Sequence, residues 1–284
     1  MIIIQKTFIE KKSTLFLVST PIGNMSDLSF RALETLKKVD YILTEDTRQA
    51  FKILNHYKFK NKLISLHEYN EKKNLKKILF LLRSNKNLAL ISNAGTPLIS
   101  DPGLFLVKNI KKEGFYVTTI PGASAFLAAF IISSFSLPFV FLGFFPRYKK
   151  NQEELFWDYR FFKGTIIFYE TALRMNKTLL FIQKHFPFSN VSLVKELTKQ
   201  FETIINGDIN SILNKNLFFK GEYVLLIENI RTPCFYSNLN LDDHIMFFLK
   251  RGFNEKEAFS LVAKERNITK KEIYKKYKIK KFEV

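Results

Sequence analysis

Residues 92–103 carry the residue types of a ligand-binding loop. They read Ser-Asn-Ala-Gly-Thr-Pro-Leu-Ile-Ser-Asp-Pro-Gly and follow the apolar run at 88–91. Glycine lets the backbone come close to a bound molecule, and proline fixes the loop before anything binds. Backbone N–H and C=O groups and small hydroxyls can hold the polar ends of such a molecule. The segment therefore predicts a site for a polar small molecule.

Two further turns of the same kind follow other apolar runs. One reads Ile-Pro-Gly-Ala-Ser-Ala at 120–125, and the other reads Ser-Thr-Pro-Ile-Gly-Asn at 19–24. Each alone would fit an ordinary turn. Ligands in open α/β sheets bind outside the carboxyl ends of the strands, so three such loops at strand ends predict one shared cleft.

A cluster of charged residues follows the predicted strand at 39–44. Glu45, Asp46, Thr47 and Arg48 put two carboxylates, a hydroxyl and a guanidinium at one strand end. A base or a nearby cation helps a weakly acidic hydroxyl to attack an electrophile, so these groups are candidates for catalysis. The alternative is that Asp46 or Thr47 caps the next helix and that Arg48 pairs with Glu45.

Further candidates for acid–base chemistry lie at other strand ends. His67 sits in a polar loop, and Lys199 follows a strand in the second half of the chain; a surface position would explain either equally well. Glu170 and Glu196 complete the set of candidates. No cysteine or histidine cluster has metal-ligand spacing, so we expect no metal.

The first half of the chain alternates strand and helix patterns, which indicates βαβ units and a parallel sheet. The helix expected at 123–134 is almost wholly apolar and is expected to be buried on several sides. Later strands follow one another with fewer helices between them, which indicates a mixed sheet in a second domain. The domains are expected at 13–136, 137–232 and 240–284, with a linker from Arg231 and three short helices at the end.

The composition describes a folded protein with a strongly basic balance. The 284 residues include 45 Lys and Arg against 26 Asp and Glu, a net charge of +19. This favours a polyanionic partner such as RNA. Compositional drift explains scattered lysines and 31 Phe equally well. No apolar run approaches the ~20 residues that span a bilayer, and no secretory signal is evident, so we expect a cytoplasmic protein without a membrane segment.

Several motifs occur in one order along residues 14–230 and carry a family resemblance. They are Val-Ser-Thr-Pro-Ile-Gly-Asn at 18–24, Glu-Asp-Thr-Arg at 45–48, His67-Glu68, the loop at 93–103, Pro-Gly-Ala-Ser at 121–124, Phe-Tyr-Glu at 168–170, Lys-Glu-Leu-Thr-Lys at 195–199 and Gly221-Glu222. Together they resemble the small-subunit ribosomal RNA methyltransferases of type I, within the tetrapyrrole methylase superfamily. The resemblance implies S-adenosylmethionine-dependent 2′-O-methylation of a cytidine ribose in the decoding region of 16S rRNA.

The same resemblance implies a fold and a cofactor site. The fold is α/β, with two α/β domains of tetrapyrrole-methylase type, a cofactor cleft between them and a small C-terminal helical domain. The implied cofactor contacts are Pro21, Asn93, Gly95, Thr96, Ile99, Ser124, Ala125, Tyr169 and Gly221. Asn93 departs from the family, which usually has aspartate there. The absence of the G-x-G-x-x-G and P-loop patterns disfavours a Rossmann or P-loop nucleotide site.

The implied partners are 16S rRNA or the small ribosomal subunit, and a second copy of the chain in a homodimer that packs through apolar faces. Phe144, Phe145 and the basic segment at 147–150 could contact RNA, or the two rings could complete a core strand. Two other functions stay open: a tetrapyrrole methyltransferase, and an RNA-binding assembly factor that lost its chemistry. The basic C-terminal helices and the segment 45–48 argue against the first.

Overall fold

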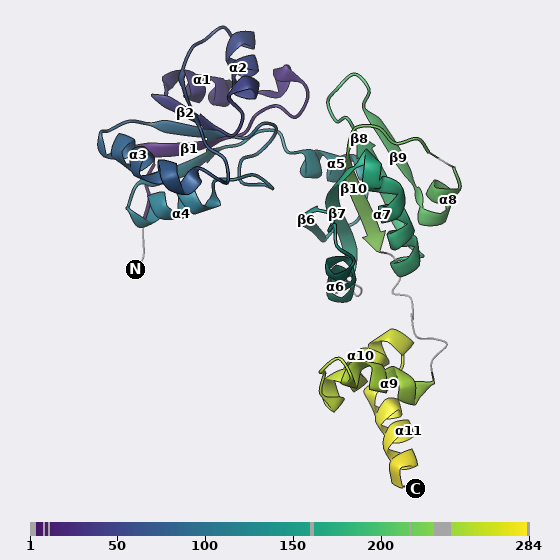
Figure 1. The fold of residues 1–284 in the computed structure, drawn as a ribbon. Coiled ribbons are helices and arrows are strands. Elements are labelled where there is room, and N and C mark those ends of the chain that lie inside the picture. The colour runs from purple at the N-terminus through teal and green to yellow at the C-terminus, as the bar shows by residue number, and fades with distance from the viewer. Residues whose placement is uncertain are drawn as a thin grey trace.

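The structure is a computed structural model that describes residues 4–7, 9–10, 12–159, 162–215, 217–229 and 240–282. It contains two five-stranded sheets and a C-terminal group of helices (Figure 1). The order of the first sheet is β3-β2-β4-β1-β5, and its paired strands are all parallel. Its strands are β1 (Thr14–Val18), β2 (Tyr41–Thr44), β3 (Lys62–Ser65), β4 (Leu88–Ile91) and β5 (Tyr116–Ile120).

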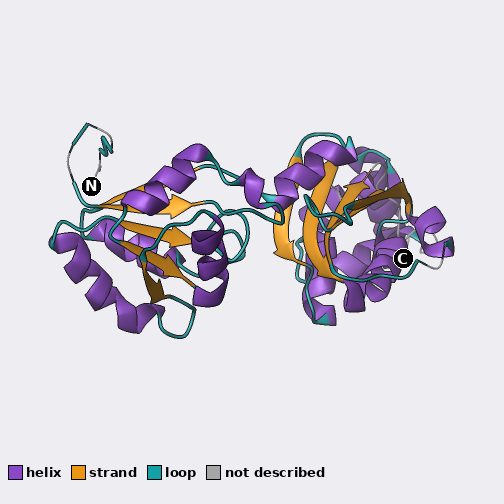
Figure 2. Ribbon diagram, turned by 90° about the horizontal axis from the view of Figure 1, so that it is seen from above, coloured by secondary structure: helices purple, strands orange, loops and turns teal. Residues whose placement is uncertain are grey.

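Helices cover both faces of this first sheet, as Figure 2 shows from above. They are α1 (Phe30–Lys38), α2 (Thr47–His56), α3 (Glu71–Arg83) and α4 (Leu104–Lys112), with a short 3-10 helix at Met25–Asp27. Buried side chains of α1 and α2, such as Leu36 and Ile53, pack on one face. Those of α3 and α4, such as Leu82 and Ile110, pack on the other. Burial on both faces explains why the strands are continuous apolar runs.

The second sheet is mixed, which confirms the expected mixed sheet. Its order is β6-β7-β10-β8-β9, where β6 runs parallel to β7 and every other pair is antiparallel. The strands are β6 (Phe139–Phe144), β7 (Gly164–Thr171), β8 (Asn190–Lys195), β9 (Thr203–Asp208) and β10 (Glu222–Asn229). The associated helices are α6 (Lys149–Tyr159), α7 (Ala172–His185) and α8 (Ile209–Asn214), which contribute to one core cluster with this sheet.

Helix α5 (Ala125–Ser133) packs on the opposite face of the second sheet. Ala129 is fully buried there, with Phe126 and Phe130 beside it. The expectation that α5 is buried on several sides is wrong, because Leu127 is 43% and Ile131 69% exposed. The helix is apolar all round, so its composition carries no signal for which face is covered. The chain thus presents an uncovered apolar surface on α5.

The C-terminal residues form α9 (Leu241–Leu249), α10 (Glu255–Arg266) and α11 (Lys270–Phe282) around their own core. Trp157 of α6 packs against this core, and the Arg251 guanidinium carbon lies 4.4 Å from the centre of the Trp157 ring. The linker expected from Arg231 lies outside the described residues. In the described part of the chain, no helix is long and apolar enough to cross a membrane.

Candidate functional site

Hydrogen bonds join the three predicted loops of the first domain at the carboxyl ends of its strands. Thr20 N–H donates to Gly95 O over 2.8 Å, and Gly95 N–H donates back to Thr20 O over 3.1 Å. Thr96 Oγ1 donates to Ala123 O over 3.1 Å, and Ser19 Oγ lies 3.2 Å from Thr96 Oγ1. Backbone hydrogen bonds and short hydroxyl side chains therefore join the loops after β1, β4 and β5 into one wall, which we call the first wall.

Two glycines allow this close approach of the loops. Gly95 has φ +83°, a left-handed conformation that side-chain-bearing residues rarely adopt. A Cβ atom on Gly122 would lie 2.8 Å from the Cβ of Ser19. The glycines that drew attention in the sequence therefore serve the packing of one loop on another.

The second wall comes from the second domain and consists of residues 194–199, the end of β7 and the start of β10. Gly23 of the first domain meets it directly, because a Cβ atom there would lie 2.6 Å from Lys199 Cγ and 2.8 Å from Leu197 O. The next residue, Asn24, donates its backbone N–H to Thr198 Oγ1 over 3.0 Å. The two domains thus touch at one edge of the site.

A cavity of about 430 Å³ lies between the two walls. Its volume is in the range typical of small-molecule sites, about 300–1,000 Å³. Among the residues that line it are eight of the predicted site residues: Asn93, Gly95, Thr96, Ile99, Ser124, Ala125, Tyr169 and Lys199. Residues from distant parts of the sequence therefore meet in one cleft.

Two predicted cofactor contacts do not line this cavity themselves. Pro21 is buried, and its neighbour Ile22 lines the cavity in its place. Gly221 has φ +90°, and a Cβ atom there would lie 2.8 Å from Glu196 Oε1. Its neighbour Glu222 lines the cavity. Both residues therefore lie next to the cleft in sequence without lining it.

The cavity contains a buried hydroxyl that lacks a partner. Among the described residues, no hydrogen-bond partner reaches the buried Oγ of Ser124, which precedes α5. A buried polar atom without a partner costs free energy of about 1–3 kcal/mol. This hydroxyl is therefore a natural contact for a polar group of a bound molecule.

Asp46 and Arg48 serve the start of α2. Asp46 Oδ1 accepts the backbone N–H of Arg48 over 2.9 Å, and the Arg48 guanidinium binds both carboxylate oxygens at 3.0 and 2.8 Å. The Arg48 side chain, helped by backbone N–H groups, holds the pKa of Asp46 at about 2. Arg48 thus pairs with Asp46 rather than with Glu45, and neither residue lines the cavity. The structure agrees with the alternative that Asp46 caps the helix, whereas the expected pairing of Arg48 with Glu45 is wrong.

Glu45 lies beside the cleft and next to an acid that sequence reasoning did not assign. Glu45 and Asp101 both line a small adjoining cavity, and Asp101 also lines the large one. Asn93 Nδ2 donates to Glu45 Oε2 over 3.1 Å. Burial, and then the charge of Glu45, raise the pKa of Asp101 to about 6. The Asp-Pro-Gly turn at 101–103 was the available signal for Asp101, and a turn is its ordinary interpretation.

His67 does not line either cavity, although Leu66 beside it lines the smaller one. The His67 ring is half-buried, and no partner among the described residues reaches its Nδ1. The structure therefore separates His67 from the cleft residues with which it was grouped as a catalytic candidate.

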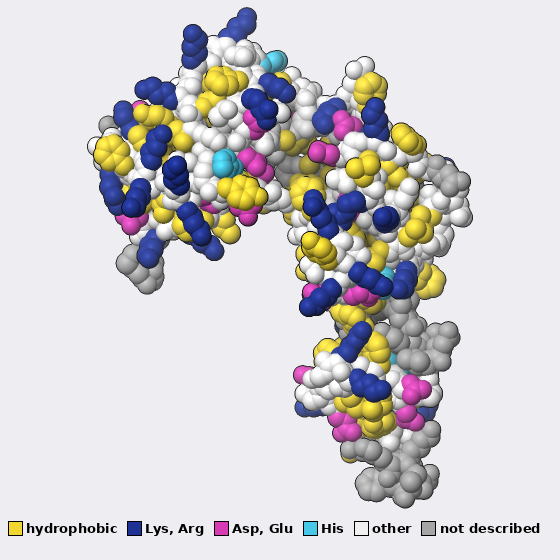
Figure 3. Space-filling view, in the orientation of Figure 1, with side chains coloured by type: hydrophobic (Ala, Val, Ile, Leu, Met, Phe, Trp, Pro, Cys, Tyr) yellow, Lys and Arg dark blue, Asp and Glu magenta, His cyan; other side chains and the backbone are white. Residues whose placement is uncertain are grey.

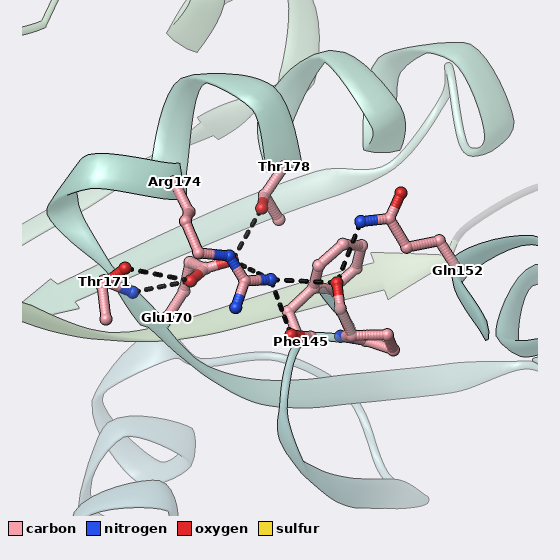
Figure 4. A network of polar contacts seen from close by, with 7 residues as sticks. Phe145, Gln152, Glu170, Thr171, Arg174 and Thr178 are labelled. Atoms are coloured by element: carbon pink, nitrogen blue, oxygen red, sulfur yellow. Dashed lines mark hydrogen bonds and ion pairs between the residues drawn. The ribbon is translucent and has the colours of Figure 1, made fainter. Parts of the chain in front are cut away.

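Glu170 belongs to a buried structural network at the end of β7 (Figure 4). Its carboxylate accepts Thr178 Oγ1 and the backbone N–H of Thr171, each over 2.7 Å, and lies 3.4 Å from Arg174 Nη2. Arg174 also donates to the carbonyl oxygen of Phe145 over 2.7 Å. These contacts hold β6, β7 and α7 together. The Glu170 carboxylate therefore has a structural role, although the residue also lines the cleft.

Other charged and aromatic candidates divide between cleft and core. Lys199 Nζ pairs with Glu196 Oε2 at 3.1 Å, and both residues line the cavity. Phe145 is 1% exposed in the core, whereas Phe144 is 57% exposed and lines the cleft. Figure 3 shows Lys and Arg side chains spread over both domains and the C-terminal helices. In the part of the chain that the structure describes, no cluster of His, Cys, Asp and Glu could hold a metal ion.

Comparisons with known proteins agree with this architecture. A sequence model of the family "Tetrapyrrole (Corrin/Porphyrin) Methylases" matches residues 14–213. The chain is 38% identical over 276 residues to a protein of Bacillus subtilis (strain 168) named "Ribosomal RNA small subunit methyltransferase I", covering 94% of each chain. It is 37% identical over 277 residues to the protein of that name from Rickettsia prowazekii (strain Madrid E), covering 95% of this chain and 98% of the relative.

Two solved structures share the fold at low sequence identity. A diphthine synthase superposes with a TM-score of 0.61 at 12% identity, over 76% of this chain and 90% of that one. A cobalt precorrin-4 methyltransferase gives 0.55 at 16% identity, over 75% and 94%. These likenesses concern the fold alone. From the family match and the relatives together, the chain belongs to the tetrapyrrole methylase family, within the group of the ribosomal RNA small subunit methyltransferase I proteins.

Proposed function

We propose that this protein transfers a methyl group from S-adenosylmethionine to the 2′-oxygen of a cytidine ribose in the decoding region of 16S rRNA. The observation that carries the proposal is the cleft of about 430 Å³, lined by residues of the motifs on which the family resemblance rests, in a chain 38% identical to an rRNA methyltransferase relative. The relatives support rRNA as the substrate class, and the resemblance of the motifs supports the cytidine 2′-oxygen.

The residues of the cleft suit the methyl donor. S-adenosylmethionine supplies a methyl group activated by a positively charged sulfur. The unpartnered Ser124 hydroxyl and the backbone around Gly95 would hold its polar ends, and Ile22 and Val224 offer apolar surface. The walls position the donor and exclude water, which is the main demand of an in-line substitution at an activated carbon.

The acceptor RNA has to reach the cleft from outside. The exposed ring of Phe144 stands at the cleft and is available to stack on a base, which is the usual way that proteins recognise unpaired RNA bases. Exposed lysines of α11 supply positive charge at the C-terminus. We expect the enzyme to act in the cytoplasm as a homodimer.

Methyl transfer from labelled S-adenosylmethionine to small ribosomal subunits that lack their modifications tests this proposal. We expect label on the ribose 2′-oxygen of one decoding-region cytidine. Donor binding without label would contradict the rRNA substrate and favour a tetrapyrrole acceptor, to be assayed next with the same donor. Absence of donor binding would favour the non-catalytic RNA-binding factor.

A further inference from the structure

Asp101 differs from the other buried or half-buried acids at the cleft in having no partner. The carboxylate of Glu170 is bound by Thr178 and Arg174, and that of Glu196 by Lys199. Among the described residues, burial and the charge of Glu45 are what act on the half-buried Asp101 carboxylate, with no hydrogen-bond donor or cation bound to it. A half-buried carboxylate that faces the site and is unpaired is free to act on a ligand.

The loop that carries Asp101 contains neighbouring residues in an unusual backbone conformation. Leu98 has φ +70° and Ser100 has φ +65°, and side-chain-bearing residues pay about 1 kcal/mol or more for that region. Gly103 has φ +120°, and a Cβ atom there would lie 2.8 Å from the side chains of Leu90 and Leu98. Strain of this kind persists where surrounding structure fixes it, and it is concentrated at functional sites. Here it presents Asp101 to the cleft.

Glu45 and Asn93 share cavity walls with Asp101: Glu45 lines the small cavity with it, and Asn93 lines the large one. The amide of Asn93 binds Glu45 over 3.1 Å. Burial and the charge of Glu45 raise the pKa of Asp101 to about 6, which suits a base that works near neutral pH. Burial also raises the pKa of Tyr169, so this neighbour stays neutral. The other titratable side chains at the cleft are Glu170, Glu196, Lys199, Glu222 and Tyr223.

We propose that Asp101 is the catalytic base that takes the proton from the acceptor hydroxyl, with Glu45, held by Asn93, as the positioning residue that tunes it. This inference rests on the proposed function. The hydroxyl proton moves to a carboxylate oxygen of Asp101 while the hydroxyl oxygen bonds to the methyl carbon. The bond between that carbon and the sulfonium sulfur breaks, and its electron pair stays on the sulfur.

Asp101→Asn separates catalysis from donor binding. We expect it to bind S-adenosylmethionine within about threefold of the wild type by calorimetry, which also shows that it folds, and to lose about a hundredfold in single-turnover rate. Asp158→Asn on the exposed surface of α6 makes the same chemical change away from the cleft and should leave the rate unchanged. An Asp101→Asn protein that reacts at the wild-type rate overturns the proposal. The proposal is also overturned if Asp101→Asn binds the donor more weakly but reacts at the wild-type rate at saturating donor concentrations. Asp101 would then serve only to attract the sulfonium.

A titration that needs no substrate tests the role of Glu45. Carbon-13 NMR of carboxyl-labelled aspartate should show the Asp101 signal, identified by its loss in Asp101→Asn, titrating near pH 6. In Glu45→Gln, both this titration and the acid limb of the rate profile should move to lower pH, since a neighbouring negative charge is gone. If the Asp101 titration or the acid limb of the rate profile does not move in Glu45→Gln, the positioning role of Glu45 is wrong. If the wild-type protein methylates no rRNA, the proposed function is wrong. If the wild type and Asp101→Asn are equally active, only the assignment of Asp101 as the catalytic base is wrong.

Discussion

The backbone N–H of Asn24 donates a hydrogen bond over 3.0 Å to Thr198 Oγ1, which joins the loop after β1 to the loop after β8 across the domain boundary. Gly23 makes this contact possible, because any Cβ there would meet Lys199 Cγ and Leu197 O at 2.6 and 2.8 Å. The closeness of the two walls thus depends on one missing side chain.

Gly23→Ala should therefore push the walls apart. We expect a tenfold or so weaker affinity for S-adenosylmethionine in calorimetry, since small displacements of a binding wall are costly. Gly207→Ala in β9 is the matched control, because its Cβ would make only ordinary contacts, at 3.5 Å or more. Equal donor affinities for the two variants would contradict this role for Gly23.

Replacing Glu170 tests whether its carboxylate stabilises the fold rather than taking part in catalysis. Glu170→Ala leaves the buried hydroxyl of Thr178 and the Arg174 guanidinium without their carboxylate, and should cost about 2–4 kcal/mol in urea unfolding. Glu154→Ala removes an exposed carboxylate 3.9 Å from Lys150 and should cost less than about 1 kcal/mol. A Glu170→Ala protein of wild-type stability that had lost activity would return Glu170 to the catalytic candidates.

The Asp46 cap predicts a specific dependence on pH. In the folded protein the pKa of Asp46 is about 2, below the ordinary aspartate pKa of 3.8. The carboxylate therefore stabilises the fold above the ordinary pKa and loses this effect as the pH falls toward 2. The melting temperature of Asp46→Ala should lie below that of the wild type at pH 7 and converge with it near pH 2. Asp46→Asn keeps a capping acceptor and should lose less. A melting difference that persisted unchanged at low pH would contradict the charge-based account.

The proposed RNA contact of the C-terminal helices is testable through salt dependence. Lys275 and Lys276 are exposed on α11. Changing both to Gln should weaken RNA binding and reduce the slope of log affinity against log salt by about 1–2. Changing Lys111 and Lys112 to Gln removes the same charge in the last turn of α4, and neither lysine lines the cavity. Identical slopes for the two double variants would indicate that the charge of α11 is compositional.

The uncovered surface of α5 tests the expected homodimer. Ile131→Glu places a charge where the side chain is 69% exposed, and light scattering should show a shift from dimer to monomer. Leu180→Glu on α7, where the side chain is 56% exposed, is the control and should leave the mass unchanged. A wild-type monomer would contradict the homodimer itself, and a dimeric Ile131→Glu protein would exclude this surface.

The loops of the site could be predicted from the sequence because their chemistry is local. Gly95, Thr96 and Ser124 stand in short motifs at strand ends, and the parallel sheet brings such ends together. The role proposed for Asp101 could not be predicted, because it depends on the neighbouring Glu45, which Asn93 binds, and on the absence of a bound cation at its carboxylate among the described residues. These relations exist only in three dimensions.

The choice between alternatives at one position also needed the structure. The sequence offered Arg48 two neighbouring carboxylates, and the cap geometry of α2 selects Asp46. The burial of helix α5 was predicted wrongly for a different reason. A uniformly apolar helix has no hydrophobic periodicity that would indicate which face is buried.

The hydrogen bonds within the first wall bear on the thermodynamics of ligand binding. The mutual backbone bonds of Thr20 and Gly95, and the bond from Thr96 to Ala123, use only groups of the chain itself and need no ligand atom. The loops therefore lose their conformational freedom during folding, and the free energy of ligand binding does not include the entropic cost of ordering them. A substitution such as Thr96→Val, which removes one of these bonds, would consequently appear in calorimetry mainly as a less favourable entropy of binding.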